Sequence, residues 1–521
     1  MKKLIVFVVT LLCGGTVFLF GNINENVFIA SSSTLVPTPS PFVCPFPCSP
    51  TESCLPVVPE CQKTPVIPKS NLFRGVDPVQ GEYIVIFEEN GCSGNCRQVE
   101  ENLKKRVAQI EKGIGGKVIH TYSRVTQGFL IKGITQTQAL EISQLKDVLY
   151  VVENSKAETH QCNLSGLNTQ FTVSVPGLWG LDRIDNNIPK TVPSGLKDNY
   201  KFKKKGDGVR VYVLDTGINA DHTQFAVGTN TRVKPLYDYY AATSTSASTS
   251  TQDCTGHGTN VAGIIGGKDY GVAKNVTLFS VRISNNDSSQ TTCGEDIEVD
   301  SIIKGLEAII AKECDDDSLN CNSDKRAVAN MSVGVNGCSF ILDNVVKNFI
   351  NNGIPLVLSA GNKGQNAIHY SPGRVKEAIT VGATMQGDEI FPNSNWGCPV
   401  DVFAPGYKIL TSSSGSDCSD NDCNKKFEGT SAAAPFVTGL IALLIEGNSF
   451  TPTTIESRIK CNSNGGMFGS NNKKCLSIAN RVKFNTSSVN IMNNANAVLT
   501  NANTTKNIVY KNRCNAAKVM R

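Results

Sequence analysis

Three short segments of the sequence carry side chains that could together activate a nucleophile. In chain order they supply a carboxylate, Asp215, an imidazole, His257, and a hydroxyl, Ser431, each within two residues of a glycine. A serine hydroxyl attacks poorly until an imidazole takes its proton, and the imidazole needs a carboxylate that fixes its tautomer and stabilises its charged form. The three segments together predict a hydrolase with a serine nucleophile.

The carboxylate is expected at the end of a buried strand. From Leu178 onward, apolar strands alternate with helical segments, which is typical of a parallel sheet covered by helices on both faces. The strand 209–214 ends at Asp215, and open sheets of this kind bind ligands at the carboxyl ends of their strands. The sequence therefore predicts an α/β fold with Asp215 at the catalytic edge of the sheet.

The general base is chosen from five histidines. His257 opens the helical segment 258–265, and its two flanking glycines would let a substrate approach the ring. His222 follows Asp215 closely and is interpreted as structural, whereas His120 falls in a separate amino-terminal region. We therefore assign the base to His257.

Two donors are expected for the oxyanion that forms during acyl transfer. Ser431 precedes a helix at 432–444, with Pro435 in its first turn, and the unpaired amides of a helix start favour negative charge. The N–H of Ser431 itself is the first donor. The second is the side-chain amide of Asn362, which follows the strand 355–358.

The amino-terminal part of the chain divides by composition. Two lysines and an apolar run at 4–20 predict a signal peptide over residues 1–21, and the alternative is an uncleaved signal anchor. Residues 22–78 form a segment rich in Pro, Ser and Cys, without regular structure. A small α+β domain of β-α-β-β-α-β order follows, with these expected elements: strand 82–87, helix 100–110, strands 117–122 and 127–132, helix 136–145 and strand 148–152.

The net charge and the cysteine content indicate which partners and which cell compartment to expect. The 521 residues carry 50 basic and 45 acidic side chains, a net charge of +5 that is too near balance to indicate a nucleic-acid partner. Nineteen cysteines in a chain that enters the secretory route predict disulfides. Apart from Cys13, six lie between Cys44 and Cys96 and twelve from Cys162 to Cys514, so a cut between these even groups could leave all thiols paired. Two plausible pairs are Cys418 with Cys423 and Cys461 with Cys475.

The chain resembles the subtilisin-like serine endopeptidases of the proteinase K type. The resemblance covers roughly residues 79 to 485 and includes all three catalytic segments, whose order Asp, His, Ser is that of subtilisin. It implies a subtilisin-like doubly wound sheet after an inhibitor-like, ferredoxin-like propeptide, and a zymogen that processes itself near residue 156. The expected divisions are a signal peptide (1–21), a Pro/Ser/Cys-rich segment (22–78), a propeptide (79–156), a processing region (157–177), a catalytic domain (178–485) and an Asn-rich tail (486–521).

The resemblance also implies a substrate site. The stretch Ser332, Val333 and Gly334 is similar to the family strand that pairs with the substrate backbone, and Ser359, Ala360 and Gly361 would complete the wall of the first specificity pocket. Val335 replaces a glycine that is usual in the family, which predicts a narrower pocket. The acids within 295–298 could select basic substrate residues, or they could simply form a solvated face.

A structural calcium ion is implied by the same resemblance, although none is required for catalysis. Asp401 would give its carboxylate, and Lys376 and Ala378 their backbone oxygens, which suits the oxygen shell that calcium prefers. Lys376 stands where the family has proline, which weakens this assignment.

The expected partners are protein and peptide substrates and the chain's own propeptide as an intramolecular inhibitor, with no membrane span once the signal is removed. Secretion would allow glycosylation at sequons, whereas a further sequon at Asn330 lies beside the substrate strand and is expected to stay unmodified. The sequons are Asn163, Asn275, Asn286, Asn485 and Asn503.

Two alternatives stay open: a catalytically inactive surface or adhesion protein of this fold, and an enzyme specialised in processing a few proteins.

Overall fold

The computed structural model describes the chain in several stretches. These are residues 71–91, 96–160, 178–184, 202–239, 255–286, 293–314, 326–414 and 420–462, a few single positions between them, and three strands near the start, β1 (Ile5–Leu11), β2 (Gly15–Gly21) and β3 (Ser40–Pro41). The chain divides into two units, Met1–Ser40 and Pro41–Arg521. In the first unit, β1 and β2 pair antiparallel. Among the described residues no helix combines the length and apolar character needed to cross a bilayer.

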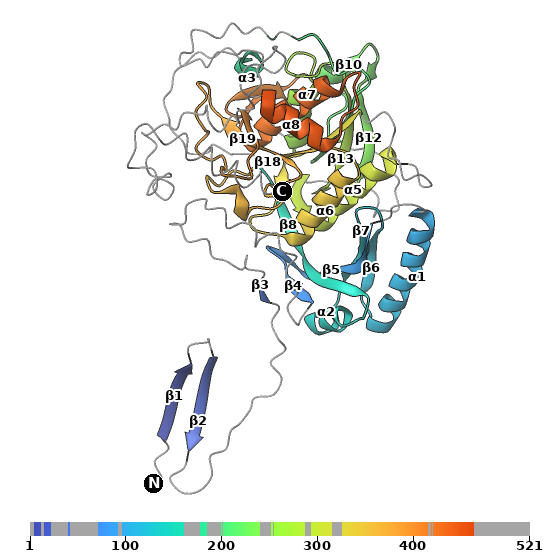
Figure 1. The fold of residues 1–521 in the computed structure, drawn as a ribbon, viewed down its shortest axis with the longest axis vertical. Helices are drawn as coiled ribbons and strands as arrows, with labels where there is room; N and C mark the ends of the chain where they lie inside the picture. The colour runs from blue at the N-terminus through green and yellow to red at the C-terminus, as the bar shows by residue number, and fades with distance from the viewer. Residues whose placement is uncertain are drawn as a thin grey trace. The chain divides into compact units, whose positions relative to one another are not determined.

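Seven parallel strands form the central sheet of the second unit (Figure 1). Every neighbouring pair is parallel, and most of the strands are largely apolar and buried because both faces of the sheet are covered, whereas the edge strand at 233–238 is more polar and partly exposed. In spatial order the strands are β12 (Val233–Asp238), β13 (Thr277–Arg282), β9 (Arg210–Asp215), β16 (Ala327–Met331), β18 (Leu356–Ser359), β19 (Ile379–Thr384) and β20 (Val402–Pro405).

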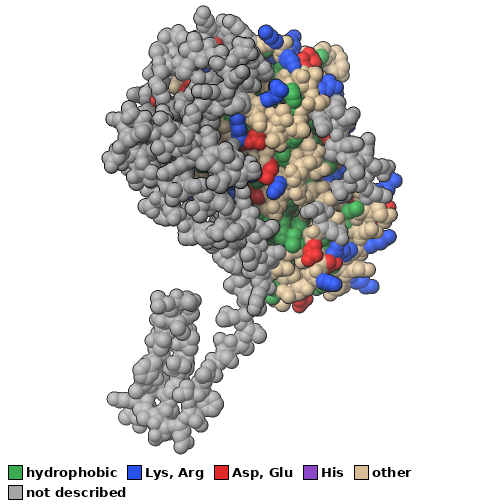
Figure 2. Space-filling view, viewed as in Figure 1, with side chains coloured by type: hydrophobic (Ala, Val, Ile, Leu, Met, Phe, Trp, Pro, Cys, Tyr) green, Lys and Arg blue, Asp and Glu red, His purple; other side chains and the backbone are tan. Residues whose placement is uncertain are grey.

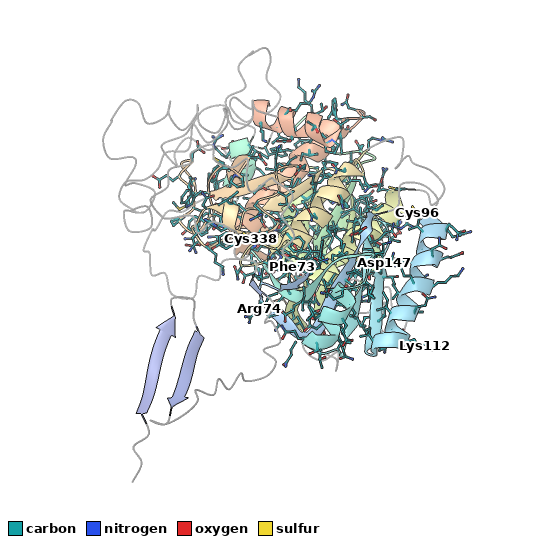
Figure 3. The ribbon with its side chains drawn as sticks, turned by 60° about the horizontal axis from the view of Figure 1, so that its bottom comes forward. Phe73, Arg74, Cys96, Lys112, Asp147 and Cys338 are labelled. Atoms are coloured by element: carbon teal, nitrogen blue, oxygen red, sulfur yellow. A yellow bond between two sulfur atoms is a disulfide. The ribbon has the colours of Figure 1, made fainter. Side chains whose placement is uncertain are left out.

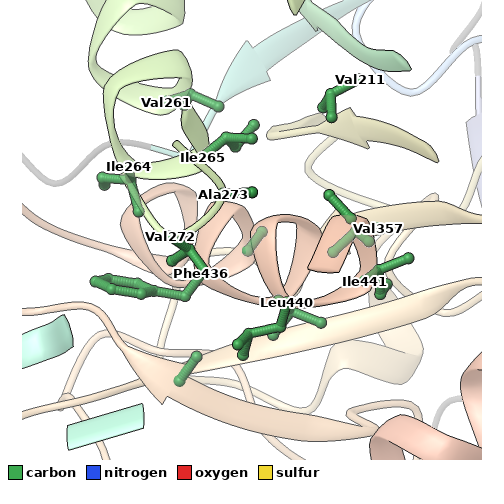
Figure 4. Packing of buried hydrophobic residues seen from close by; sticks show 14 of the residues in the cluster. Val211, Val261, Ile264, Ile265, Val272, Ala273, Val357, Phe436, Leu440 and Ile441 are labelled. Atoms are coloured by element: carbon green, nitrogen blue, oxygen red, sulfur yellow. The ribbon is translucent and has the colours of Figure 1, made fainter. Parts of the chain in front are cut away.

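Helices cover both faces of this sheet, as the sequence predicts. One face packs against α4 (His257–Gly266) and α7 (Thr430–Ile445), where Val211 of β9 lies in one buried apolar cluster with Ile265 and Ile441 (Figure 4). Tyr212 and Leu214, which alternate with these positions, lie in a second cluster with α5 (Val299–Glu313) and α6 (Phe340–Asn351). The expected α/β class with helices on both faces is confirmed.

Shorter elements complete this main domain (residues 178–462). They are α3 (Trp179–Ile184), the 3₁₀ turns η2 (Thr223–Phe225) and η4 (Ala367–His369), the strands β10 (Ala226–Val227), β11 (Asn230–Thr231), β14 (Ser284–Asn286), β15 (Cys293–Glu298), β17 (Val333–Gly334), β21 (Ile409–Ser412) and β22 (Asn424–Phe427), and the helix α8 (Pro452–Asn462). On the face that Figure 2 shows, basic and acidic side chains are interspersed, in keeping with the near balance of charge.

The amino-terminal domain (residues 71–160) has the expected β-α-β-β-α-β order. Four strands of its sheet are antiparallel in the order β8, β5, β7, β6, and the short strand β4 pairs parallel with β8. Two helices bury an apolar core against one face, with Cys96 and Lys112 near opposite ends of the longer helix (Figure 3). The elements are β4 (Leu72–Arg74), β5 (Pro78–Asn90), α1 (Cys96–Ile114), β6 (Lys117–Tyr122), β7 (Thr126–Lys132), α2 (Gln136–Ser143) and β8 (Val148–Thr159).

Strand β8 differs most from its prediction, because it continues to Thr159 instead of ending near Val152. Its first part pairs with β5 of the amino-terminal domain, and its last residues pair with β15 and β17 of the main domain. One strand therefore joins the two domains through backbone hydrogen bonds.

Candidate active site

Asp215 and His257 form a buried carboxylate–imidazole pair. Asp215 ends β9, and its Oδ1 lies 2.6 Å from Nδ1 of His257, the first residue of α4. The same oxygen accepts the N–H of Thr216 at 2.8 Å. Both side chains are almost fully shielded from solvent. Nδ1 therefore carries the proton toward the carboxylate, and Nε2 is left as the basic nitrogen.

A second buried acid, Asp253, holds the two loops that carry this pair. Its Oδ1 accepts the hydroxyl of Thr216 at 2.8 Å and the N–H of Gly256 at 2.9 Å, and its Oδ2 accepts the N–H of Thr259 at 2.7 Å. Sequence reasoning missed this residue. The signal available was an acid four residues before His257, at the start of a helix, where carboxylates accept free amides.

The glycines beside His257 have a different purpose from the one expected. Gly256 has φ of +90°, and a Cβ added there would lie 2.2 Å from the carbonyl oxygen of Ser414. A Cβ on Gly258 would lie 2.0 Å from the carbonyl oxygen of Gly217. Close backbone packing, more than access for a substrate, explains both positions.

Ser431 lies in the first turn of α7, which starts one residue earlier than Ser431. Its hydroxyl donates to the carbonyl of Ser332 at 3.3 Å. Among the described residues, the buried Nε2 of His257 has no hydrogen-bond partner. Pro435 falls in the second turn and not the first. Because proline has no N–H, the intrahelical hydrogen bond from this position to the carbonyl of Ser431 is missing.

Two donors converge on one carbonyl, and they are the two groups that are expected to bind an oxyanion. The Nδ2 amide of Asn362 and the N–H of Ser431, the latter at 3.3 Å, both donate to the carbonyl oxygen of His160. Thr430 orients the amide, because its N–H and hydroxyl donate to Oδ1 of Asn362 at 2.9 and 3.0 Å. Gly429 leaves the space open, since a Cβ there would lie 2.7 Å from the same His160 oxygen.

The end of β8 lies across this site in the manner of a bound peptide. Thr159 and Glu158 pair antiparallel with Val333 and Gly334 of β17, and the N–H of His160 donates to the carbonyl of Ser332 at 3.0 Å. On the other side, Ala157 and Lys156 pair with the end of β15. The structure therefore brings the predicted substrate strand, with its residues Ser332, Val333 and Gly334, against the chain's own backbone.

The imidazole of His160 fills the adjoining pocket. Its Nδ1 lies 2.6 Å from Oγ of Ser359. A Cβ on Gly334 would lie 2.8 Å from Cε1 of the ring, and one on Gly361 would lie 3.9 Å away. Ala360 is buried in a small cluster of its own. Val335 does not narrow this pocket as expected, because its side chain packs with the apolar cluster under α5 and α6.

The acids of β15 take separate roles. Asp296 lies 4.0 Å from the ammonium of Lys156, and both side chains are exposed. Glu298 accepts instead from the side-chain amide of Asn154 at 2.9 Å. An exposed pair at this distance contributes little binding energy, so the contact gives only slight support to selection of a basic substrate residue.

Carboxylates of α5 hold the amino-terminal domain. Glu307 accepts three consecutive backbone N–H groups from the turn between β6 and β7, those of Ser123, Arg124 and Val125. Two turns earlier on the same helix, Asp300 accepts from Tyr122 and lies 2.9 Å from Nδ1 of His120. Phe73, labelled in Figure 3, adds an aromatic contact with Phe340 of the main domain, the ring centroids being 5.2 Å apart.

The predicted calcium ligands do not form an open cation site. Oδ1 of Asp401 lies 2.5 Å from the ammonium of Lys460, and its Oδ2 accepts the N–H of Thr380 at 2.9 Å. The carboxylate that should anchor the cation together with the carbonyls of Lys376 and Ala378 is already neutralised by a lysine. The residues present therefore do not fit the metal.

Other sequence predictions have mixed outcomes. Cys418 and Cys423 form a disulfide, as expected, whereas Cys475 lies outside the described residues. His222 is structural, with its Nε2 2.7 Å from the carbonyl of Cys423. Asn330 is fully buried, which agrees with the expectation that it is not modified.

This fold and site define a class: a hydrolase with a parallel α/β sheet, a buried carboxylate–imidazole pair where β9 ends, and Ser431 in the first turn of α7. The model of the subtilase family matches residues 206–484. An extracellular serine proteinase of Thermus sp. (strain Rt41A) is 34% identical over 400 residues, which cover 74% of this chain and 84% of the relative. Alkaline serine exoprotease A of Vibrio alginolyticus is 37% identical over 413 residues, or 78% of this chain and 69% of the relative.

The chain belongs to the subtilase family and is a serine endopeptidase. Among solved structures, fervidolysin from Fervidobacterium pennivorans, a keratinolytic enzyme related to subtilisin, matches with a TM-score of 0.54 and 23% identity. The match covers 75% of this chain and 60% of that chain, and it supports the fold.

Proposed function

We propose that the chain is a secreted zymogen whose Asp215, His257 and Ser431 cut the bond between His160 and Gln161, so that the amino-terminal domain becomes a bound inhibitor. One observation carries the proposal: the carbonyl oxygen of His160 accepts from both expected oxyanion donors. The bond lies four residues beyond the boundary at 156 that the sequence suggests, because β8 continues into the site.

The chemistry follows from the positions of these groups. The Ser431 hydroxyl turns from the Ser332 carbonyl toward Nε2 of His257, which takes its proton while Oγ attacks the carbonyl carbon of His160. The amides of Asn362 and Ser431 stabilise the resulting oxyanion. The bond to the nitrogen of Gln161 then breaks as His257 returns the proton to it, and water hydrolyses the acyl enzyme by the same steps.

Asp215 acts by holding His257 and stabilising its charged form. The carboxylate is buried and 2.6 Å from Nδ1, so the attraction is strong when the imidazole gains a proton. Asp253 supports the same geometry through the loops on either side.

Secretion is the setting that we infer. The apolar amino-terminal run, the disulfide between Cys418 and Cys423, and a relative named as extracellular support it. Glycosylation is then possible at exposed sequons such as Asn275. A structural calcium ion at Asp401 is not part of the proposal.

The test is expression of the full chain beside Ser431→Ala and Ser413→Ala, followed by intact mass and amino-terminal sequencing. Ser413 is a matched control, since it is a buried serine outside the site. We expect the unmodified chain and Ser413→Ala to yield a fragment that begins at Gln161, and Ser431→Ala to stay uncut. Equal processing of all three chains, or a fragment that begins elsewhere, would contradict the proposal. An inactive surface protein would leave all three chains uncut.

A further inference from the structure

The pocket beside the oxyanion donors contains a polar side chain that a simple apolar slot would lack. Ser359 ends β18, is 1% exposed, and its Oγ lies 2.6 Å from Nδ1 of His160. The imidazole itself is 5% exposed. A buried hydroxyl loses its water when a substrate enters, so it needs a polar partner on the incoming side chain.

The walls of the pocket match a flat ring of this size. Gly334 and Gly361 face the imidazole, and a Cβ added at Gly334 would lie 2.8 Å from Cε1 and 3.0 Å from Nε2 of the ring. The ring therefore lies against backbone, and Ser359 is the side chain that meets its Nδ1. A phenyl ring would fit this shape but would leave the hydroxyl unpaired.

The electrostatic surroundings favour the neutral imidazole. Burial lowers the pKa of His160 to about 4. The carboxylate of Glu158 and a backbone hydrogen bond at Ser359 partly oppose this, whereas His257 and Lys363 lower the pKa further. Glu158 and Lys363 form an ion pair of 3.0 Å with each other, so little of the Glu158 charge is left to attract a cation. A free histidine has a pKa near 6.5 and is mostly neutral at pH 8.

We propose that the mature enzyme selects histidine immediately before the bond it cuts, and that the Ser359 hydroxyl is the residue that determines this preference. The proposal rests on the proposed function, since it takes the seat of His160 as the substrate pocket. The substrate class is peptides whose residue at this position has a ring nitrogen that can pair with Ser359.

The test compares two peptides built on the chain's own sequence from Lys156 to Thr159, followed by either His or Phe and a chromogenic leaving group. Enzyme that has matured from the full chain is used, as the unmodified protein, Ser359→Ala and Ser413→Ala. At pH 8 we expect kcat/KM to favour His by about tenfold or more, the effect of one unpaired buried hydroxyl. Ser359→Ala should abolish most of this ratio, and Ser413→Ala should keep it.

A second measurement needs no variant. If only the neutral ring enters, the His-to-Phe ratio of the unmodified enzyme should fall by about elevenfold between pH 8 and pH 5.5, since one free imidazole in about eleven is then neutral at a pKa of 6.5. The ratio cancels the titration of His257, which both peptides share. This pH dependence tests the selection of a neutral histidine even if Ser359→Ala does not fold.

The outcomes separate the two proposals. A preference for Phe at pH 8, a ratio unchanged by Ser359→Ala, or a ratio that does not change with pH would overturn the selection of histidine while the enzyme still cuts both peptides. Absence of any cleavage that depends on Ser431 would instead remove the proposed function.

Discussion

Under the proposed function, replacing Glu307 by alanine should weaken the binding of the amino-terminal domain to the rest of the enzyme after processing. The carboxylate accepts the N–H groups of Ser123, Arg124 and Val125 at 3.1, 2.7 and 2.6 Å, and it is 6% exposed. Without it, three amides lose their acceptor in the complex but are hydrated in the separated domain. At about 1 kcal/mol for each amide, the complex is weakened by about 3 kcal/mol, or roughly 100-fold in Kd.

Dilution of the processed complex measures this change. Initial rates on a chromogenic peptide are recorded over a dilution series, and the concentration at which half of the full activity appears should rise about 100-fold in Glu307→Ala. Glu446→Ala is the matched control, because Glu446 accepts two backbone amides, those of Lys205 and Gly206, inside the main domain. It should lower thermal stability and leave the midpoint unchanged. A midpoint for Glu307→Ala within threefold of the unmodified enzyme would refute the reasoning.

Two further predictions concern residues behind the site. Asp253→Asn keeps the size of the side chain but weakens its hydrogen bonds with Thr216 and Gly256. We expect kcat to fall by about 100-fold, KM to stay nearly unchanged and the pH profile to shift. An effect on KM alone would contradict a positioning role. Lys460→Met should lower the melting temperature, because it leaves Asp401 buried without its cation. Chelators should not alter the heat inactivation of the unmodified enzyme. Protection by added calcium would show that the ion pair is not what holds Asp401.

The site was predictable from sequence wherever local context carried the chemistry. Asp215 follows an apolar strand and Ser431 begins an apolar helix, so their neighbours reveal the positions of both. Asn362 follows another strand of the same sheet, and parallel strands end at one edge. The elements of the small domain were equally predictable, since β5 and β7 are short apolar runs between polar segments, and both of their faces are buried.

Contacts between distant segments were not predictable in the same way. The stretch from Asn154 to Thr159 is polar and shows no alternation, and it is extended because β15 and β17 supply its hydrogen bonds. Likewise, nothing near Asp401 in the sequence indicates that Lys460 will neutralise it, because that pair depends on where α8 packs. The same limit applies to Val335, which was expected to narrow the pocket but packs in the apolar cluster that contains residues of α5 and α6.

If the enzyme matures as proposed, the continuity of β8 lets the amino-terminal domain delay the onset of activity. The strand is held on one side by β5 within its own domain and, further on, by β15 and β17, so cutting after His160 removes no rung of either ladder. After the cut, the end of β8 stays in place as long as the small domain stays folded. The folded domain already holds this strand extended, which lowers the entropic cost of binding it. Under the proposed function, the delay before activity would depend on how often the small domain opens, and therefore on its apolar core, which is remote from Ser431.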